Sequence, residues 1–379
     1  MIAAEPAPLI DEAPADDAST ANTAGYQVPP AREVSRGGRR RPRLRDERIT
    51  LAHGAGGTAT HALVEELFLE ELRNPALEQL GDAGLVRAGV ERLALSTDSF
   101  VVRPLAFPGG DIGELAVNGT VNDLSMAGAR PLALSAAFVL EEGLEVEELR
   151  RYARSMARAA AAANVQIVTG DTKVVEHARG DGLQITTAGI GLLDERVSLG
   201  PHNVRAGDAV LVSGTLADHG MAVMVARGEL ALEAEIRSDT APLNGLANAL
   251  FALGPALRWL RDPTRGGLAT TLNELAQATG LAVRLDESAL PVRPEVAAAC
   301  EILGIDPLYA ANEGKLIAVV APERADEALR LLRAHQIGAE AAIVGAVAPE
   351  PAGMVALDTS FGGSRIVGML VGDPLPRIC

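Results

Sequence analysis

The chain has 379 residues, of which 48% are hydrophobic and only 3% aromatic, so its core must be built from Ala, Val, Leu and Ile. A formal net charge of −16 repels phosphate backbones and argues against nucleic acid as a partner. No apolar run reaches the ~18 residues of a membrane span, and the N-terminal segment lacks the pattern of a secretory signal. Its two cysteines, Cys300 and Cys379, form no disulfide framework, so we expect a protein of the reducing cytoplasm.

The length is about twice that of a usual domain, which predicts two domains. Residues 1–48 are rich in Ala, Pro and acidic residues and then in Arg, without periodicity, so we expect a disordered extension. Residues 49–199 and 200–358 each mix helix and strand patterns, which predicts two α/β domains. Residues 359–379 are punctuated by glycine and proline, and we expect a flexible tail.

Helices and strands follow one another along both predicted domains. In the first we expect helices over 58–72, 122–129 and 146–163, and strands over 131–140, 165–175 (ending in Gly170-Asp171) and 183–193. In the second we expect strands near 209–214, 315–322 and 341–349, and helices over 221–227, 268–280 and 325–336, with another that ends near Trp259. Cys300 lies in a helical apolar stretch and should be buried.

The stretch "HGAGGTATH", His53 to His61, places Gly54, Gly56 and Gly57 just before a predicted helix. Backbone N–H groups there can approach an anion, and the helix dipole favours negative charge. The spacing matches neither G-x-G-x-x-G nor the P-loop, and an ordinary turn is the alternative. His53 is a candidate catalyst or a capping residue.

Three carboxylates, Asp98, Asp123 and Asp171, are predicted at strand-to-loop junctions. Oxygen ligands of this kind suit Mg²⁺, which usually takes a few carboxylates together with substrate phosphates. Each residue alone could instead be a turn or N-cap residue. Their recurrence, with Asn118 and Asn122 close to Asp123, favours metal and phosphate binding.

Three further polar positions could act on a substrate. Lys173 follows Asp171 by two and would project on the same side of an extended segment, as a point charge for phosphate. In "RDPTRGG", Thr264 or Arg265 could meet an anion at a helix start. In "ANEGK", Glu313 is a candidate general base, with a surface acid as the alternative.

Together, seven stretches resemble the HypE family of hydrogenase maturation proteins: "LAHGAGG", "STDSFVV", "VNGTVNDLSMAGARP", "GDTKVV", "DPTRGGLA", "NEGK" and the terminal "PRIC". The resemblance runs from about residue 49 to the end of the chain. It implies the two-domain ATP-binding fold that this family shares with aminoimidazole ribonucleotide synthetase, selenophosphate synthetase and thiamine-monophosphate kinase. It also implies a homodimer whose N-terminal sheets pair into a barrel.

The resemblance also implies a reaction. A carbamoyltransferase, HypF, would load a carbamoyl group onto the thiol of Cys379, and ATP-driven dehydration would convert it to a thiocyanate. The cyano group would pass to iron on a HypC–HypD complex and become a ligand of the [NiFe] hydrogenase site. Prolines near the end would keep the tail extended, and glycines would give it pivots.

The site residues are assigned on this reading. Asp98, Asp123 and Asp171 would hold Mg²⁺, Lys173 would stabilise the transferring phosphoryl group, and Glu313 is favoured over His53 as the base. ATP would meet Gly54, Gly56, Gly57, Asn118, Asn122, Asp123, Asp171 and Thr172.

Two alternatives remain at this point. One is another ATP-dependent enzyme of the superfamily, although a selenophosphate synthetase would need a reactive cysteine near the start of the ordered chain. The other is a nucleotide-binding scaffold that docks maturation partners without turnover.

Overall fold

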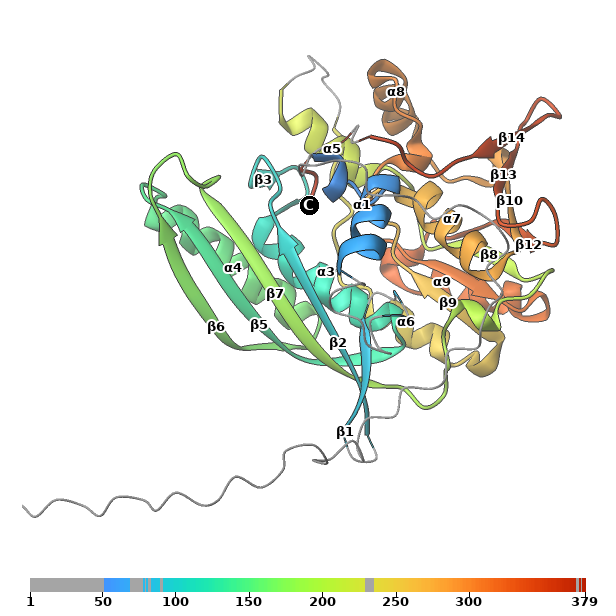
Figure 1. The fold of residues 1–379 in the computed structure, drawn as a ribbon, viewed down its shortest axis with the longest axis horizontal. Helices are drawn as coiled ribbons and strands as arrows, with labels where there is room; N and C mark the ends of the chain where they lie inside the picture. Colours follow the sequence, from blue (N-terminus) through green and yellow to red (C-terminus); the bar gives the residue numbers. More distant parts are fainter. Residues whose placement is uncertain are drawn as a thin grey trace, which may run out of the picture.

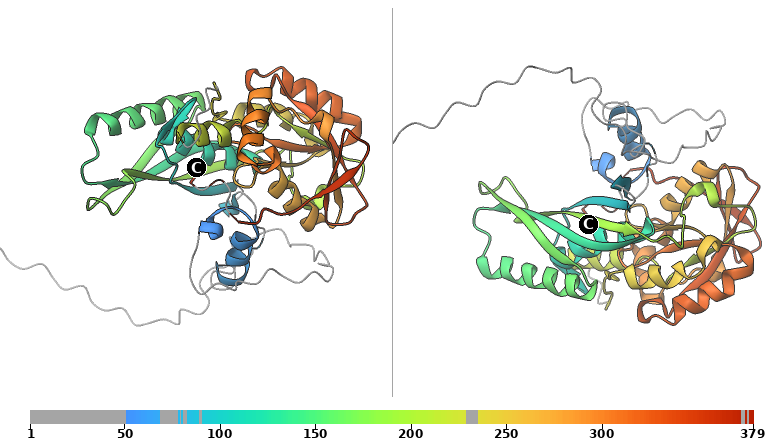
Figure 2. Two further views of the ribbon diagram at one scale, coloured as in Figure 1. Left: turned by 90° about the horizontal axis from the view of Figure 1, so that it is seen from above. Right: turned by 90° about the horizontal axis from the view of Figure 1, so that it is seen from below.

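The computed structural model describes residues 51–68, 78, 80, 83–88, 91–228, 235–372, 375 and 377–379. The predicted extension at 1–48 and the two prolines at 374 and 376 lie outside these residues. The described chain forms two α/β halves, each built on one main sheet, as Figures 1 and 2 show. None of the described helices is long and apolar enough to cross a membrane.

The first half is built on a five-stranded sheet in the order β1-β2-β7-β5-β6. Its strands are β1 (Gly84–Ala88), β2 (Glu91–Phe100), β5 (Ala129–Glu141), β6 (Gln166–Val175) and β7 (Leu183–Leu193). Neighbours are antiparallel except for β5 and β6, which are parallel. A small ribbon, β3 (Ala106–Phe107) with β4 (Gly110–Asp111), leads into the first long helix.

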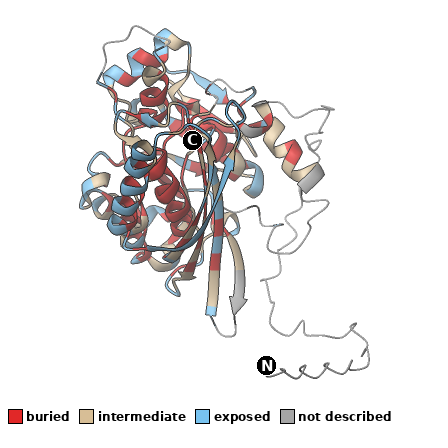
Figure 3. Cartoon of the chain, turned by 90° about the vertical axis from the view of Figure 1, so that its left-hand side faces the viewer, coloured by how far each residue is buried: buried red, intermediate tan, exposed pale blue. Residues whose placement is uncertain are grey.

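Helices α3 (Ile112–Met126) and α4 (Val146–Ala162) cover one face of this sheet (Figure 1). Asp111 caps α3, since its carboxylate accepts hydrogen bonds from the amides of Gly113 and Glu114. Strand β6 is exposed over nearly its whole length, and Figure 3 shows exposed stretches along this sheet. Apolar side chains on β2, β5 and β6 are among the exposed ones.

The second half contains a seven-stranded sheet in the order β14-β13-β10-β12-β8-β11-β9. Its strands are β8 (Ala209–Val212), β9 (Leu257–Arg261), β10 (Ala282–Asp286), β11 (Ile317–Val320), β12 (Ala342–Ala348), β13 (Val355–Asp358) and β14 (Ser364–Val367). Helices α6 (Asn244–Phe251), α7 (Gly267–Thr279) and α9 (Ala325–Arg333) pack against it, while α5 (Asp218–Ala226) and α8 (Pro294–Leu303) share a hydrophobic cluster with α3 and α4. The 3₁₀ turns are η4 (Pro201–Asn203), η5 (Gly254–Ala256), η6 (Glu287–Ala289), η7 (Pro307–Tyr309), η8 (Pro322–Arg324) and η9 (Gln336–Gly338).

Before the first sheet lie η1 (Leu51–Gly54), α1 (Thr58–Leu63) and a π-turn, η2 (Val64–Phe68). In the views of Figure 2 this segment stands out from one side of the body, near the place where the two halves meet.

Most predicted elements are confirmed, including β11, β12, α7 and α9, but several bounds are wrong. Asp98, Asp123 and Asp171 do not lie at strand-to-loop junctions; they lie inside β2, α3 and β6. Likewise, the helix expected to end near Trp259 ends at Phe251, and Trp259 belongs to β9.

Close-packed glycines explain why helix α3 starts earlier than predicted and why strand β6, predicted over 165–175, runs past Gly170-Asp171. Helix α3 begins at Ile112 rather than at residue 122, because its glycines serve close packing instead of ending the helix: a Cβ on Gly113 would lie 2.4 Å from the Tyr152 carbonyl oxygen of α4. Strand β6 continues through Gly170, where a Cβ would lie 2.2 Å from the Ala136 carbonyl oxygen of β5. A glycine that lets two backbones approach looks, in sequence, like a glycine that turns the chain.

The chain end returns to the first half. Strand β14, within the predicted tail, pairs antiparallel with β13. Beyond it, Leu375, Ile378 and Cys379 are buried in the same hydrophobic cluster as α3 and α4. Cys300 is buried as predicted. The end of the tail therefore rests inside the body in this structure, and its mobility stays a prediction.

Candidate active site

The candidate site lies between the two halves, where helix α3 meets loops of the second half. Asn122 donates to the carbonyl oxygens of Ala241 (3.1 Å) and Glu313 (3.2 Å), and its own Oδ1 accepts from the Leu243 amide at 2.7 Å. One turn earlier, Asn118 Nδ2 donates to Thr240 Oγ1 at 3.1 Å. Two amides on one helix face thus hold the loop 238–243 and the loop that carries Glu313.

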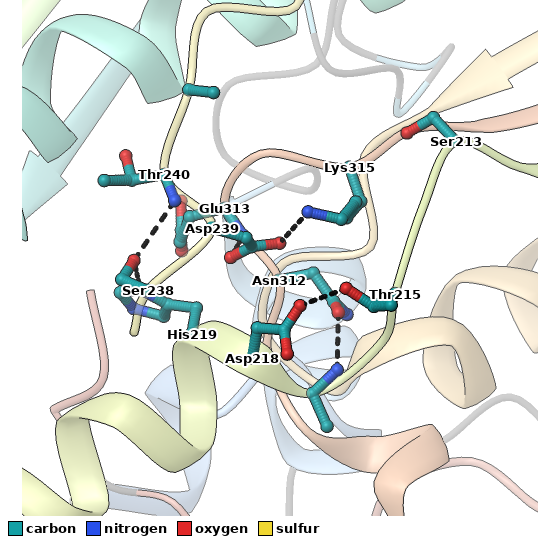
Figure 4. Close-up of polar contacts among 12 residues, drawn as sticks. Ser213, Thr215, Asp218, His219, Ser238, Asp239, Thr240, Asn312, Glu313 and Lys315 are labelled. Carbon is teal, nitrogen blue, oxygen red and sulfur yellow. Dashed lines mark hydrogen bonds and ion pairs between the residues drawn. The ribbon is translucent and has the colours of Figure 1, made fainter. Parts of the chain in front are cut away.

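Asp239 joins these two loops (Figure 4). Its Oδ1 accepts from the Glu313 amide and its Oδ2 accepts from Lys315 Nζ, both at 3.1 Å. Burial alone would raise the pKa of Asp239, but Lys315 and His219 hold it below its ordinary range. The contact requires Gly314, because a Cβ there would lie 1.7 Å from the Asp239 carbonyl oxygen.

The Glu313 side chain is buried, and among the described atoms its Oε1 has no hydrogen-bond partner. Burial raises its pKa well above the ordinary value, and the negative charges of Asp262 and Asp239 add to the effect, while Arg265 opposes it. A carboxyl group in this state is a strong proton acceptor once it ionises, which is the property of a general base.

Arg265 is the positive charge of the site. The charge of Cys379 contributes most to raising the pKa of this guanidinium, and burial opposes the rise. The negative charges of Asp98, Glu313 and Asp123 raise the pKa further. Burial raises the pKa of Asp98, although the positive charge of Arg265 lowers it. Burial also raises the pKa of Asp262 to about 6. The strand β2, the helix α3, the second half and the chain end therefore meet around one arginine.

The glycine-rich loop covers this arginine. Gly56 has φ +77°, and a Cβ there would lie 3.0 Å from the Arg265 carbonyl oxygen, so a side chain would be strained and crowded. A Cβ on Gly57 would lie 2.4 Å from the carbonyl oxygen of Leu370, which also accepts a 3.1 Å hydrogen bond from the Thr58 amide. His53 is buried in the preceding turn.

Comparison with known proteins identifies the family of the chain. Residues 80–193 match the family described as AIR synthase related protein, N-terminal domain, and residues 205–358 match its C-terminal domain. The carbamoyl dehydratase HypE of Azotobacter vinelandii is 52% identical over 336 residues, which cover 89% of this chain and 98% of the relative. The chain belongs to the HypE family of carbamoyl dehydratases.

Solved structures of the HypE family have the same fold. A HypE–HypF complex matches with a TM-score of 0.78 and 48% identity, covering 82% of this chain and 100% of that one. HypE in complex with ATP matches with a TM-score of 0.73 and 47% identity, covering 88% of this chain and 100% of that one. The mixed α/β fold and the family predicted from the sequence are therefore confirmed.

The predicted site residues of this HypE-family chain fall into two groups. One group gathers around Arg265 and the loops just described: Asp98, Asp123, Asn118, Asn122, Glu313, Cys379 and the glycines 56 and 57. The other group, Asp171, Thr172 and Lys173, is exposed on β6, where Asp171 Oδ2 lies 2.5 Å from Lys173 Nζ. Among the described residues, no group of three His, Cys, Asp or Glu side chains is arranged to hold a metal ion.

Sequence reasoning did not assign Asp239, Asp262, Lys315 or His219 to the site. Lys315 stood in the quoted "NEGK", and Asp262 in "RDPTRGG", but neither position shows its role without the fold. Asp239 and His219 come from "IRSDTAP" and "LADHGM", which carry no pattern that separates them from other loop and helix residues.

Proposed function

We propose that this chain carries a carbamoyl group on Cys379 and dehydrates it to a thiocyanate at the expense of ATP, which prepares the cyanide ligand of a [NiFe] hydrogenase. The burial of Cys379 beside Arg265, within electrostatic reach of Glu313 and Asp98, carries this proposal. A terminal cysteine with no chemical role would have no reason to end in a cluster of buried charges.

The proposed chemistry consists of two steps. The carbonyl oxygen of the S-carbamoyl group takes the γ-phosphoryl group of ATP, and ADP leaves, so that an oxygen that departs poorly becomes a phosphate ester. The nitrogen then loses its protons, the C–O bond breaks with release of phosphate, and the S–C≡N group remains. Alignment and charge neutralisation contribute most to the first step, and a base is needed for the second.

Glu313 is the base in this proposal. Its Oε1 is a buried acceptor without a described partner, and a carbamoyl NH₂ would supply the missing donor. Asn118 Oδ1 is a second buried acceptor without one. His53 remains the less favoured candidate. Arg265 would stabilise negative charge on the carbamoyl oxygen as it is phosphorylated.

The residues around Arg265 fit ATP with Mg²⁺ in part. Asp98 and Asp123 offer two carboxylates on adjacent elements, and Ser96 Oγ orients Asp123 through a 2.5 Å hydrogen bond to its Oδ2. This number suits Mg²⁺, which binds one or two carboxylates plus substrate phosphates and would neutralise phosphate charge. The glycine loop 54–57 would face the nucleotide. A related protein of the same fold, HypE, has been solved in complex with ATP, which supports a nucleotide site here.

The exposed strand β6 carries Asp171, Thr172 and Lys173. These three residues therefore fit a role in binding ATP and Mg²⁺ less directly than the residues around Arg265. In a homodimer whose sheets pair, this strand would be covered, and the three residues would then reach the nucleotide. The exposed apolar side chains of β2, β5 and β6 favour such pairing: Leu95, Val139, Val168 and Val174.

The partners follow from the family. HypF would load Cys379, in line with the solved complex of a related HypE with HypF, and a HypC–HypD complex would receive the cyano group. The reaction would take place in the cytoplasm.

The test is mass spectrometry of the C-terminal peptide after incubation with the carbamoyltransferase partner, carbamoyl phosphate and ATP. We expect a gain of one carbamoyl group followed by loss of one water. Cys379→Ser should show no thiocyanate, and Cys300→Ser should behave as the parent protein. ATP turnover without any change at Cys379 would favour another enzyme of the superfamily, and no turnover at all would favour a scaffold.

A further inference from the structure

His219, near the start of α5, joins the chain end to the loop that carries Asp239. Its Nε2 lies 2.8 Å from the Ile378 carbonyl oxygen, and its Nδ1 lies 2.8 Å from Ser238 Oγ. A carbonyl oxygen can only accept, so Nε2 must carry a proton. The imidazole therefore donates to the residue next to Cys379.

The second nitrogen has a defined role as well. Ser238 Oγ accepts a hydrogen bond from the Thr240 amide at 3.1 Å, so its own proton is free to point at Nδ1. The ring is then neutral, with one donor and one acceptor, both used. Burial lowers the pKa of His219, which agrees with a neutral ring, and Phe107 packs at right angles to it with 5.3 Å between ring centroids.

Residues 238–240 pass this contact on. Ser238 binds His219, Asp239 binds the Glu313 amide and Lys315, and Thr240 binds Asn118 on α3. Figure 4 shows His219 and Ser238 at one end of this set and Glu313 with Lys315 at the other. The chain end and the candidate base thus share one short loop.

We propose that His219 is a positioning residue that couples docking of the C-terminal tail to the alignment of Glu313. When the tail leaves, the Nε2 proton loses its acceptor in a buried site, which is unfavourable unless the ring or its neighbours rearrange. Rearrangement at Ser238 moves the residue next to Asp239, which holds the Glu313 amide. The base is therefore aligned when the loaded cysteine is in place, and released when it is not.

The inference rests on the proposed function, and its test separates the two. Three variants divide the contacts: His219→Asn keeps a group near Ser238 but falls short of Ile378, and His219→Gln extends a donor to Ile378. Ser238→Ala keeps the tail contact and breaks the link to the loop. Two rates are measured on each: alkylation of Cys379 by iodoacetamide in the unloaded protein, and single-turnover nitrile formation after loading, with saturating ATP.

We expect His219→Asn to be alkylated at Cys379 at least tenfold faster than the parent protein and to form nitrile at least tenfold more slowly. His219→Gln should restore the parent alkylation rate, because it again donates to Ile378, but it should form nitrile several-fold more slowly than the parent, because it lacks the contact with Ser238. Ser238→Ala should be alkylated at the parent rate and still form nitrile several-fold more slowly. Cys300, whose pKa burial raises to about 11, serves as the internal reference for intact folding, since unfolding would expose it.

Parent rates in His219→Asn would overturn the proposal. So would a slow nitrile step in both His219 variants with unchanged alkylation, because the residue would then act without holding the tail. Ser238→Ala with the parent rate of nitrile formation would refute the link to Glu313. The alkylation measurement needs no dehydration: a parent protein that formed no nitrile would refute the proposed function, and alkylation would still decide whether His219 holds the tail.

Discussion

The backbone amide of Val101 donates a 3.1 Å hydrogen bond to a main-chain carboxylate oxygen of Cys379, the last residue. Two residues after Val101, the Arg103 amide donates a 3.2 Å hydrogen bond to the carbonyl oxygen of Arg377, which lies two residues before Cys379. The last residues of the chain thus lie antiparallel to the segment that follows β2, the strand that carries Asp98. Main-chain pairing of this kind fixes the register of the tail, and with it the position of the thiol.

The side chain of Arg377 should hold the tail in this register. Its guanidinium donates to Asp181 at 2.8 Å and to the Val101 carbonyl oxygen at 3.1 Å, and its backbone has φ +54°, a conformation that non-glycine residues rarely adopt. We expect Arg377→Ala to raise the alkylation rate of Cys379 about fivefold, the equivalent of ~1 kcal/mol for a partly exposed charged contact.

A matched variant tests whether the Arg377 effect is specific. Arg365 on β14 also makes an ion pair, at 2.5 Å from Asp306, but far from the chain end in sequence and in contact with a different segment. Arg365→Ala should leave the alkylation rate of Cys379 unchanged. If both variants accelerate it equally, loosening of the whole segment after β14 would be the better explanation.

Gly57 should be sensitive to the smallest possible substitution. In Gly57→Ala the new Cβ would meet the Leu370 carbonyl oxygen at 2.4 Å, and both are backbone-fixed, so the glycine loop or the tail must shift. We expect at least tenfold weaker ATP binding by calorimetry with a small change in Tm. Gly368→Ala, with nothing within 4 Å of its Cβ, is the control and should bind ATP as the parent does. Normal ATP affinity in Gly57→Ala would place the nucleotide elsewhere.

Sequence reasoning found the elements of this site more readily than their arrangement. Glu313 and the glycine loop stand in short polar stretches beside apolar ones, so their chemistry shows in the sequence. Asp239 does not, because its role comes from contacts with Glu313 and Lys315, about 75 residues away in the chain. The helix that carries Asp123 is predicted too short, from residue 122, since its first half contains Gly113 and Gly119 and only tertiary packing shows why a helix tolerates them.

Glu313→Gln should lower the rate of nitrile formation at least a hundredfold, while HypF-dependent loading of Cys379 continues. In the parent protein the rate should rise with pH, since the base must ionise and burial raises the pKa of Glu313 well above 4.5. Single-turnover mass spectrometry across a pH series measures both. A flat profile in the parent protein, or unimpaired dehydration by Glu313→Gln, would contradict this assignment.

The same substitution should stabilise the fold. A carboxyl group whose folded pKa is raised contributes stability below its unfolded value of 4.5, and this contribution is lost as pH rises toward the folded value. Glutamine does not titrate, so the Tm of Glu313→Gln should exceed that of the parent by about 2 °C or more at neutral pH, and the gap should close near pH 4.5. A gap that widened on acidification would mean that Glu313 is stabilised as the ion.

His61 should contribute stability that is likewise lost as pH rises, but at another contact and at higher pH. Its Nε2 lies 3.0 Å from Glu274, so the helix after the glycine loop is tied to α7. The hydrogen bond that His61 donates to Glu274 raises the pKa of His61 above 6.5 in spite of burial. Glu65 adds to the rise, and Arg261, itself 3.2 Å from Glu274, opposes it. Stability from this pair is complete below pH 6.5 and is lost as pH rises through the folded pKa.

The expected result is a Tm difference between the parent protein and His61→Gln of about 2–4 °C at pH 6, which shrinks toward zero by pH 9. Differential scanning calorimetry at several pH values measures it, and His202→Gln, at an exposed position in η4, should show no such trend. A constant difference from pH 6 to 9 would show that His61 acts through packing and a neutral hydrogen bond. In that case the charge of His61 would not be what holds the glycine loop against α7. Loss of this charge between pH 6 and 9 should then leave nucleotide binding unchanged.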